Sequence, residues 1–481
     1  MQTDVLIVGA GPTGLALAIQ FIRYGIDFII LDAKETTTPH SKAIGVQART
    51  LEIYEQIDLA KSLISKGAIA KKARLVVGGK VRGEAEFGEL GKGLSPYPFV
   101  LIVEQGKHEK LLHEHIKAKG REVLWQTELI SFTQGETGVK ANVRKVNGDS
   151  KEIQAKFLVG CDGASSSVRH ALGLTFEGST FERLFYVADV EINWNFSHDA
   201  LHVCLAKNTS TAFFPMPGET SYRIVGTFPE DHPREVDEIL YEEVERQIIR
   251  DTGINLDITR VNWFSVYKVH TRHVNRFSQG RCFLAGDSAH IHTPAGAQGM
   301  NTGIQDGYNL AWKLWLVLQK QTDRGILETY NEERLENAKN LLKTTDQAFN
   351  IFASRDWLVS LLRTRVAPYI AGFALRTNAV KKFLFPRVSQ IGINYRHSSL
   401  SRNGESDFNV KAGDRMPYFL IDGKSVYDRL RQPKFHLLAF SPEDRSSTAT
   451  LDELAHEYGE LLDFNVIPLS PPIVQVFGSD K

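Results

Sequence analysis

Cysteine is scarce in this 481-residue chain, and neither sign of charge is in excess. The three cysteines, Cys161, Cys204 and Cys282, lie far apart and show no CxxC spacing. This usage argues against a disulfide framework or a cysteine-built metal site, and it is typical of small buried side chains in a reducing compartment. Lys plus Arg equals Asp plus Glu at 57 each, without blocks of like charge, so a nucleic-acid partner is disfavoured.

Long hydrophobic runs are also missing. A membrane-spanning helix needs about 18 uninterrupted apolar residues, and the best candidate, 311–318, is broken by Lys313. The first residues, MQTDVLIVGAG, have neither the basic start nor the apolar length of a signal peptide. We therefore expect a cytoplasmic protein without an integral membrane segment, and the length predicts two or three domains.

A glycine-rich segment near the start of the chain is the first motif. Residues 9–14 read GAGPTG and lie between an apolar run over 5–8, which predicts a buried strand, and a helical pattern over 15–24. This strand, turn and helix is the arrangement that binds a dinucleotide pyrophosphate at a helix N-terminus. It does not distinguish NAD from FAD.

Each glycine of the motif has a physical role in such a site. Gly9 permits the tight turn, Gly11 lets the backbone approach the pyrophosphate, and Gly14 lets the helix pack closely on the strand. A second predicted strand over 28–31 ends in Asp32, which is near the expected distance for an acid that binds ribose hydroxyls.

Two later segments repeat the pattern of a strand that ends in an acid. Residues 157–169 read FLVGCDGASSSVR, a strand running into a loop and a short helix. Residues 281–290 read RCFLAGDSAH, and residues 294–301 follow with PAGAQGMN. Asp-Gly and Gly-Asp are common turn dipeptides, but their order and context across almost 300 residues make coincidence a poor explanation.

The order of these motifs resembles the single-component flavoprotein aromatic hydroxylases of the p-hydroxybenzoate hydroxylase type, which include phenol, polyketide, rifamycin and tetracycline monooxygenases. The resemblance implies an α/β fold with a Rossmann-like FAD-binding domain, an inserted β-sheet substrate domain, a helical region and a thioredoxin-like C-terminal domain. It also implies FAD as cofactor and NADPH or NADH as reductant. A flavin C4a-hydroperoxide would then hydroxylate an aromatic or enol-type substrate such as a phenol, polyketide or antibiotic.

The resemblance assigns expected roles to the acidic motifs. In the family, the position of Asp287, next to Gly286, holds the flavin ribityl chain. Asp162, Gly163 and Arg169 match the Asp-Gly motif, which is associated with FAD and nicotinamide binding. The alternative is an ordinary strand-end aspartate and a surface arginine.

The PAGAQGMN segment is expected to face the flavin ring. Its glycine-rich turn precedes a helix that begins near Asn301, so N–H groups and the positive helix end could stabilise negative charge on a reduced ring. The residues expected to act at the ring are Pro294, Gly296, Gly299 and Asn301. The cofactor contacts expected beside them are Ala297, Gln298 and Met300.

Two further segments match positions that contact FAD in the family. The stretch 40–52 resembles a loop and helix beside the flavin and includes Lys42 and Arg49. Many relatives carry Arg where this chain has Lys42, so planar bidentate recognition is lost there. Gln105 matches a contact to the flavin side chain, and the alternative is an exposed glutamine at a helix start.

Alternating strand-like runs between residues 178 and 266 predict a sheet that covers the flavin. The segment 212–217 resembles a family strand that lines the substrate cavity. Its candidate wall residues are Phe213, Phe214 and Met216, for each of which plain core packing is an equally compatible interpretation.

The motif positions predict a discontinuous FAD-binding domain over 1–177 and 267–395, with residues 73–99 as a segment that could join the sheet domain over 178–266. Residues 396–481 resemble the thioredoxin-like domain of larger relatives but contain no cysteine, so redox work there is excluded. The stretch 357–385 mixes apolar and basic residues and predicts a packed helix or an oligomer face, such as that of a homodimer, rather than membrane contact.

Three other functions remain open at this stage. A flavin-dependent halogenase shares the fold, but the WxWxIP motif of those relatives is absent from this sequence, and a flavin disulfide oxidoreductase would need a close cysteine pair. A flavin-binding protein without turnover is the third. The substrate, the choice between NADH and NADPH, and a general base are not given, although His290 and His292 lie close to the motif.

Overall fold

A mixed sheet built around parallel strands forms the layer that carries the motifs. The computed structural model describes residues 1–39, 43–207, 209–229, 239–293, 296–353, 377–404, 408–441 and 449–478. The central strands run in the order β17-β18-β11-β1-β2-β8, and β10 and β9 extend from β11. Their bounds are β1 Gln2–Val8, β2 Phe28–Leu31, β8 Val123–Leu124, β9 Thr127–Gln134, β10 Val139–Lys145, β11 Ser150–Gly160, β17 Ser278–Gln279 and β18 Cys282–Leu284.

Parallel pairing in this sheet brings the motif-bearing strand ends to one edge. β1 pairs in parallel with β2 and β11, and β11 pairs in parallel with β18. The carboxyl ends of these four strands therefore point the same way, which is the edge where ligands bind in open α/β sheets. The strand predicted over 28–31 is confirmed with the same bounds.

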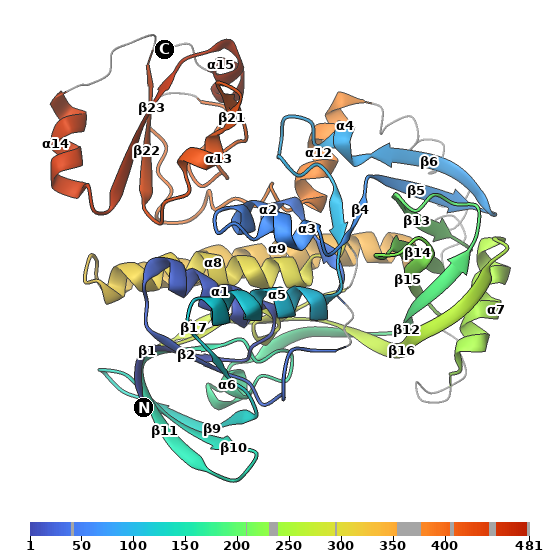
Figure 1. Cartoon of the computed structure of the whole chain (residues 1–481), viewed down its shortest axis with the longest axis horizontal. Coiled ribbons are helices and arrows are strands. Elements are labelled where there is room, and N and C mark those ends of the chain that lie inside the picture. The colour runs from blue at the N-terminus through green and yellow to red at the C-terminus, as the bar shows by residue number, and fades with distance from the viewer. Residues whose placement is uncertain are drawn as a thin grey trace.

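Helices α1 (Pro12–Tyr24), α5 (Gln105–Ala118) and α8 (Gly299–Leu318) pack beside one another across this sheet (Figure 1). α1 begins with a proline, which needs no N–H partner there, and ends at Gly25 in the left-handed conformation with φ 68°. The other elements around this layer are α2 Ala48–Glu55, α3 Ala60–Ile64, α4 Phe87–Leu90, α6 Ser167–Ala171, η2 Gly286–Ser288, η3 Arg324–Leu327, α9 Glu328–Ala353, α12 Asn378–Val388, β3 Gly45–Val46, β4 Ala68–Ala70 and β7 Val100–Ile102.

A second eight-stranded sheet has the order β19-β16-β12-β15-β14-β13-β5-β6. Its pairs are antiparallel except β13 with β5, and helix α7 (Tyr241–Thr252) lies beside it on the right of Figure 1. The sequence segment 72–86 thus joins the later strands. The bounds are β5 Lys72–Val77, β6 Lys80–Glu86, β12 Phe176–Asn193, β13 Ala200–Leu205, β14 Ser210–Pro215, β15 Ser221–Thr227, β16 Asp257–Val274 and β19 His290–Ile291.

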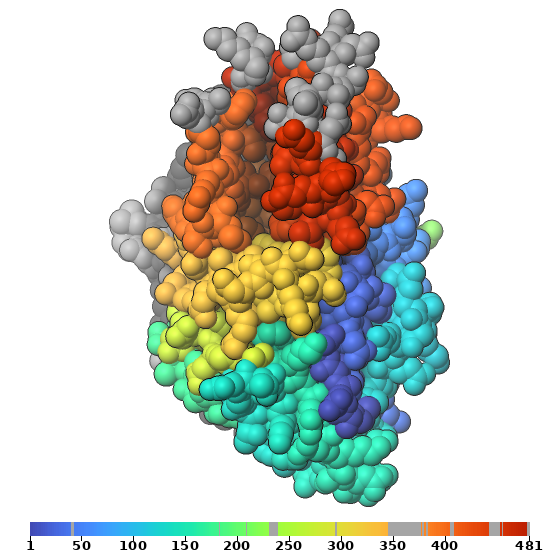
Figure 2. Space-filling model, turned by 90° about the vertical axis from the view of Figure 1, so that its left-hand side faces the viewer, coloured from blue at the N-terminus to red at the C-terminus, as the bar shows by residue number. Residues whose placement is uncertain are grey.

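The C-terminal residues form a small separate unit. Parallel strands β22 (Phe435–Ser441) and β23 (Leu462–Pro468) are connected through α14 (Ala449–Tyr458) and followed by α15 (Pro471–Phe477). β20 (Leu420–Ile421), β21 (Lys424–Ser425) and α13 (Val426–Arg429) precede them. Figure 2 shows this unit, in orange and red, stacked on the face that α8 and the N-terminal segment form.

The α/β fold class with a Rossmann-like domain, a second sheet, a helical region and a C-terminal unit is confirmed. The domain boundaries themselves stay a prediction. Most of the stretch 357–385, up to residue 376, lies outside the described residues. Among the helices that the structure describes, none combines the length and the apolar character that a membrane crossing requires.

Candidate functional site

The three motif loops line one cavity of about 560 Å³, which we call the glycine-loop cavity. It lies at the carboxyl edge of the parallel sheet. Residues separated by almost 300 positions in the chain meet there. The predicted site residues on its walls are Gly9, Gly11, Asp32, Gln105, Asp162, Gly163, Asp287 and Met300.

The glycines of the first motif differ in what surrounds them. A Cβ on Gly9 would lie 2.3 Å from the carbonyl oxygen of Cys161, and φ is +103° there. A Cβ on Gly14 would lie 2.0 Å from the carbonyl oxygen of Gly9. A Cβ on Gly11 would meet no atom within 4 Å. Gly9 and Gly14 therefore serve the packing of the loop, whereas Gly11 keeps open the space into which a pyrophosphate would fit.

Asp32 links the end of β2 to the glycine loop. Its Oδ2 accepts a hydrogen bond from the backbone N–H of Ala10 at 2.7 Å, and its Oδ1 accepts from the N–H of Lys34 at 2.8 Å. Each carboxylate oxygen has a second lone pair, so the carboxylate can still accept hydrogen bonds from ribose hydroxyls in the cavity.

Asp162 carries a buried acceptor that lacks a partner. Its Oδ2 accepts from the Ser167 hydroxyl at 3.0 Å and from the Val168 N–H at 3.2 Å. Its Oδ1 is buried, and no partner for it is found among the described residues. Because an unpaired buried oxygen costs roughly 1–3 kcal/mol, a ligand donor at this point of the cavity wall would restore the lost hydrogen bond. This oxygen and the open space at Gly11 fit a bound dinucleotide.

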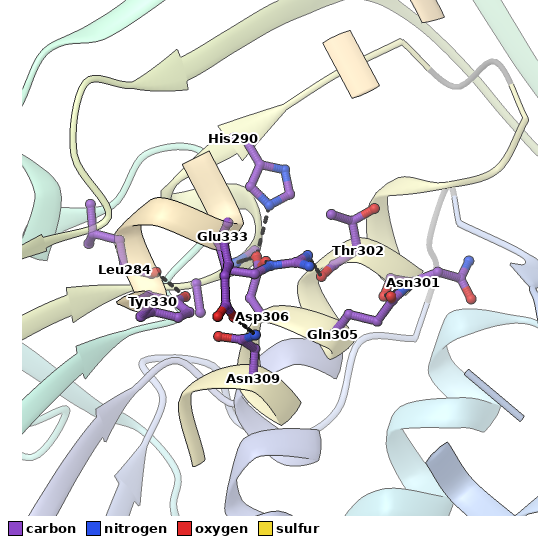
Figure 3. Close-up of polar contacts among 12 residues, drawn as sticks. Leu284, His290, Asn301, Thr302, Gln305, Asp306, Asn309, Tyr330 and Glu333 are labelled. Atoms are coloured by element: carbon purple, nitrogen blue, oxygen red, sulfur yellow. Dashed lines mark hydrogen bonds and ion pairs between the residues drawn. The ribbon is translucent and has the colours of Figure 1, made fainter. Parts of the chain in front are cut away.

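The Gly286-Asp287 turn is held from behind by a buried aspartate. Asp306, on α8, accepts hydrogen bonds from the Gly286 N–H at 2.8 Å and from His290 Nε2 at 2.8 Å. Arg334 Nε donates to the other oxygen of Asp306 at 2.6 Å. Figure 3 shows the His290 ring directed toward Asp306. Asp306 and Arg334 are both 0% exposed, so this is a buried ion pair.

Asp287 itself is directed into the cavity rather than into this network. The protein around it raises the pKa of its carboxyl, chiefly by desolvation and further by the nearby charge of Asp306. A carboxylate in such surroundings gains from hydroxyl donors, which the ribityl chain of a flavin carries.

The turn over 296–299 separates two cavities. Met300 lines the glycine-loop cavity, whereas Gly296 and Gln298 line a second, larger space. Ala297 has φ 52°, a left-handed conformation that costs energy for a residue with a side chain. Gln298 donates from Nε2 to the carbonyl oxygen of Arg387 at 3.2 Å, which ties the turn to α12.

Asn301 positions this turn through a side chain whose contacts lie within the protein. Its Oδ1 accepts from the Gln47 N–H at 2.9 Å and from the Thr50 hydroxyl at 2.8 Å. Its Nδ2 donates to the carbonyl oxygens of Gly45 and Ala297, each at 2.9 Å. The amide therefore accepts two hydrogen bonds and donates two, all within the protein. Asn301 acts as a positioning residue that fixes the start of α8 to the segment 45–50.

The second space, which we call the sheet cavity, measures about 750 Å³. It lies between strands β13 to β15, the first turns of α8, and helices α9 and α12. Phe214 is on its wall. Phe213 is not on this wall, because alternate residues of a strand face opposite sides: Phe213 is 0% exposed and packs on Trp194 with ring centroids 4.7 Å apart. Met216 is buried in the main core.

Arg49 lies in a third cavity, between α2 and the C-terminal unit, rather than on the wall of the glycine-loop cavity. Its Nη1 pairs with Glu52 at 3.1 Å, and its guanidinium lies 5.7 Å from the centre of the Tyr308 ring. The prediction that Arg49 contacts the cofactor does not fit this placement. Successive helical residues are rotated by about 100°, so Thr50 turns toward Asn301 while Arg49 turns away.

Arg169 joins the two acidic loops instead of facing the cavity. It is 2% exposed and donates from Nη1 to the Ser288 carbonyl oxygen at 3.0 Å and from Nη2 to the Ala164 carbonyl oxygen at 2.8 Å. The alternative of a surface arginine is therefore wrong. Lys42 and Pro294 lie outside the described residues.

The sequence did not identify several residues that reach the site only through the folded arrangement of the chain. Glu109 lines the glycine-loop cavity one turn after Gln105, whose Nε2 donates to Glu109 Oε1 at 2.7 Å. Thr13 lies against Gly286, since a Cβ added to Gly286 would be 2.4 Å from the Thr13 hydroxyl oxygen. Asp306 had one usable signal: it is an acid on the buried face of an apolar helix. Within the described residues, no cluster of side chains suited to a metal ion occurs.

His292 provides a pH-dependent contribution to stability near the turn. Its Nδ1–H donates to the Thr293 carbonyl oxygen at 2.7 Å, and burial lowers its pKa from 6.5 to about 4. The unfolded chain therefore binds a proton at this histidine between those two pH values, whereas the folded chain does not. The contribution of His292 to the free energy of unfolding is fully present above about pH 6.5. It falls by about 1.4 kcal/mol per pH unit as the pH drops toward about 4.

We expect His292→Gln to remove this share of the acid sensitivity. Urea unfolding measured at several pH values between about 7 and 4.5 should give a shallower fall of the unfolding free energy for the variant than for the wild type. Equal slopes for the two proteins would contradict a buried neutral imidazole.

Comparisons with known proteins agree with this geometry. The model of the FAD binding domain family matches residues 2–345. A flavin-dependent monooxygenase of Mycobacteroides abscessus is 32% identical over 453 residues, covering 91% of this chain and 89% of that protein. The 6-methylpretetramide 4-monooxygenase of Streptomyces rimosus is 29% identical over 473 residues, covering 96% and 83%.

Solved structures give the same family. An anhydrotetracycline hydroxylase from Streptomyces rimosus superposes with a TM-score of 0.74 at 25% identity, covering 100% of this chain and 91% of that one. An aromatic hydroxylase from angucycline biosynthesis superposes with a TM-score of 0.77 at 28% identity, covering 98% and 91%. With the family model spanning most of the chain and the motif loops gathered on one cavity, this protein belongs to the FAD-binding domain family.

Proposed function

We propose that this protein is an FAD-dependent monooxygenase that uses NAD(P)H and O₂ to hydroxylate an aromatic or enol-type substrate. The observation that carries the proposal is the position of the 296–301 segment between two cavities: the glycine-loop cavity, which Asp32, Asp162 and Asp287 line, and the larger, mainly apolar sheet cavity. Relatives of this chain include proteins named as 6-methylpretetramide, pentachlorophenol and rifampicin monooxygenases. The halogenase and disulfide oxidoreductase alternatives are not favoured.

The residues of the glycine-loop cavity would each hold one part of FAD. Gly11 and the start of α1 would receive the pyrophosphate, and Asp32 would accept from the adenosine ribose. Asp287 would accept from the ribityl hydroxyls, and Asp162 Oδ1 would take a further donor. When bound, FAD supplies the electron transfer and oxygen chemistry that no side chain provides.

The turn over 296–299 would stabilise negative charge on the ring system beside it. It lies at the N-terminal end of α8, where free N–H groups and the helix dipole favour anions. Asn301 holds the turn in place through its four hydrogen bonds. This rigidity matters because donors that are already oriented need not reorganise as charge develops.

The sheet cavity would hold the substrate. Its walls are mainly apolar, with Phe185, Leu201 and Phe214 on the sheet side, so an aromatic guest is bound with little water around the reacting carbon. His290 is engaged with Asp306 and is not assigned as a base. The cytoplasmic location and the homodimer stay predictions from the sequence.

Steady-state oxidation of NADH and NADPH tests the proposal. The FAD-loaded protein would be screened with mono- and polycyclic phenols, and products would be analysed by mass spectrometry. We expect substrate-stimulated oxidation of one reductant and a product heavier by one oxygen atom. A protein that binds FAD but shows no stimulation with any of these compounds would instead support a flavin-binding protein without turnover.

A pair of neighbouring variants tests the assignment of the sheet cavity. Phe213→Ala removes a fully buried ring and is expected to lower the unfolding free energy by about 3–5 kcal/mol. Phe214→Ala changes the cavity wall and is expected to raise KM for the substrate about tenfold with a smaller loss of stability. If Phe214→Ala left KM unchanged, the substrate would not bind against this strand.

A further inference from the structure

A third cavity, which we call the interdomain cavity, has a volume of about 600 Å³ and no assigned ligand. Its walls come from α1, α2 and α8 on one side and from the C-terminal unit on the other. The two sides are joined by direct contacts, among them Arg23 Nη2 to the Arg431 carbonyl oxygen at 2.5 Å and Arg415 Nη2 to the Leu94 carbonyl oxygen at 2.7 Å. The cavity thus lies within an interface that hydrogen bonds hold together. Domain interfaces are frequent places for ligand sites.

The interdomain cavity is distinct from the sheet cavity. Gln305 and Gln390 stand between them, with Gln305 Nε2 donating to Gln390 Oε1 at 2.7 Å and Gln390 Nε2 donating to the Thr302 hydroxyl at 2.9 Å. Both glutamines line the interdomain cavity, and Thr302 lines the sheet cavity. A ligand in one space is therefore separated from a ligand in the other by a hydrogen-bonded wall.

Aromatic rings make up much of the wall of the interdomain cavity. Trp312 of α8 and Phe435 of β22 approach one another across the interface with ring centroids 5.8 Å apart. Rings on several sides of a cavity favour a flat ligand that can stack on them. The aromatic residues on the wall are Tyr24, Tyr308, Trp312, Tyr395, Tyr427 and Phe435.

The carboxylates on the wall are already neutralised. Glu52 pairs with Arg49 Nη1 at 3.1 Å, and Glu333 pairs with Lys313 Nζ at 2.8 Å. Asp414 pairs with Arg396 Nε at 2.6 Å. These ion pairs leave little negative field in the cavity, because each negative charge has a cation in contact with it.

Two cations on the wall have only neutral oxygen partners. Arg23 donates from Nη1 to Gln56 Oε1 at 2.8 Å and from Nη2 to a backbone carbonyl oxygen, and Lys434 donates from Nζ to the Gly459 carbonyl oxygen at 2.7 Å. Within the part of the chain that the structure describes, neither forms an ion pair with a carboxylate. Arg415 adds a third cation, which lies 3.8 Å from Glu52. The cavity is therefore positive as well as aromatic.

We propose that the interdomain cavity binds an aromatic anion, a flat ring system carrying a carboxylate or phosphate group, as a site separate from the flavin and the hydroxylation substrate. The rings of Trp312 and Phe435 would hold the flat part, and Arg23 and Lys434 would receive the negative group. Charge-assisted contacts of this kind are worth about 1.5–3 kcal/mol each, which corresponds to roughly tenfold or more in affinity.

Isothermal titration calorimetry on the FAD-loaded full chain, without reductant, tests this site. The probes are 2-naphthoate with its neutral analogue 2-naphthol, and AMP with adenosine. We expect at least one anion to bind about tenfold more tightly than its neutral analogue. Tight 2-naphthoate binding would identify a carboxylate ligand, and tight AMP binding a phosphate ligand.

Two variants and a matched control locate the binding. Lys434→Gln and Arg23→Gln should each weaken the bound anion about tenfold, whereas Lys424→Gln, an exposed lysine of the same unit away from the cavity, should not. Lys434→Gln is the safer variant, since that lysine bonds only to a carbonyl oxygen of its own unit. No anion binding, or anion binding that Lys434→Gln leaves unchanged, would overturn the proposal. Because turnover is not measured, the result is independent of the hydroxylase assignment.

Discussion

Gly11→Val is expected to give a folded protein that is colourless after purification with added FAD. Gly11 has φ −77° and ψ −173°, an extended conformation that valine adopts readily. A Cβ there meets no protein atom within 4 Å, so the valine side chain would extend into the cavity and occupy the space of the pyrophosphate. We expect the affinity for FAD to fall at least about hundredfold, a loss of roughly 3 kcal/mol, as measured by FAD titration and gel filtration.

The other glycine of the helix start provides the control. Gly14→Val would place its Cβ 2.0 Å from the Gly9 carbonyl oxygen, so it should lower the melting temperature or prevent folding. The same substitution at two positions three residues apart is therefore expected to lower FAD affinity in one case and the stability of the fold in the other. If Gly11→Val retained FAD as well as the wild type does, the glycine-loop cavity would not be where the pyrophosphate binds.

Arg334→Met is expected to lower the free energy of unfolding by about 3–5 kcal/mol, although Arg334 lies outside the glycine-loop cavity. It would leave the Asp306 carboxylate, which is 0% exposed, without its main cation, and the Thr302 carbonyl oxygen would lose a donor at 3.2 Å. Because Asp306 also accepts from the Gly286 N–H, the Asp287 turn should lose order and FAD should be held less tightly. Urea unfolding and FAD titration measure the two effects.

The double variant Asp306→Asn with Arg334→Met separates charge from shape. Removing both charges avoids a buried carboxylate without a cation. The double variant should therefore be markedly more stable than the single variant Arg334→Met. A double variant that is as unstable as the sum of the two single variants would show that the ion pair itself is not what holds the turn.

Local sequence signals were enough for the parts of the site that lie within one strand, turn and helix. The predicted turn at Gly9 and the strand over 28–31 are present, and the helix predicted to begin near Asn301 begins at Gly299, because each depends on neighbouring residues. The convergence of Asp32, Asp162 and Asp287 also followed, since acids at the ends of parallel strands meet at one edge.

The direction of side chains and the contacts between distant segments could not be predicted from the sequence. Arg49 and Phe213 carry residue types suited to their predicted roles, but one residue of rotation on a helix or strand turns each away from its cavity. The hydrogen bonds of Asn301 to the segment 45–50 join residues about 250 positions apart, which no local pattern encodes. The charged residues Asp306 and Lys313 on an apolar helix were the available clue to buried pairing.

A crystal structure of the FAD-loaded protein tests the central claim most directly. It should show a single FAD with its pyrophosphate at Gly11, its ribityl chain at Asp287 and its ring system against the 296–299 turn, facing the sheet cavity. An FAD found in the interdomain cavity, or a ring system turned away from the 296–299 turn with these loops unoccupied, would contradict the account.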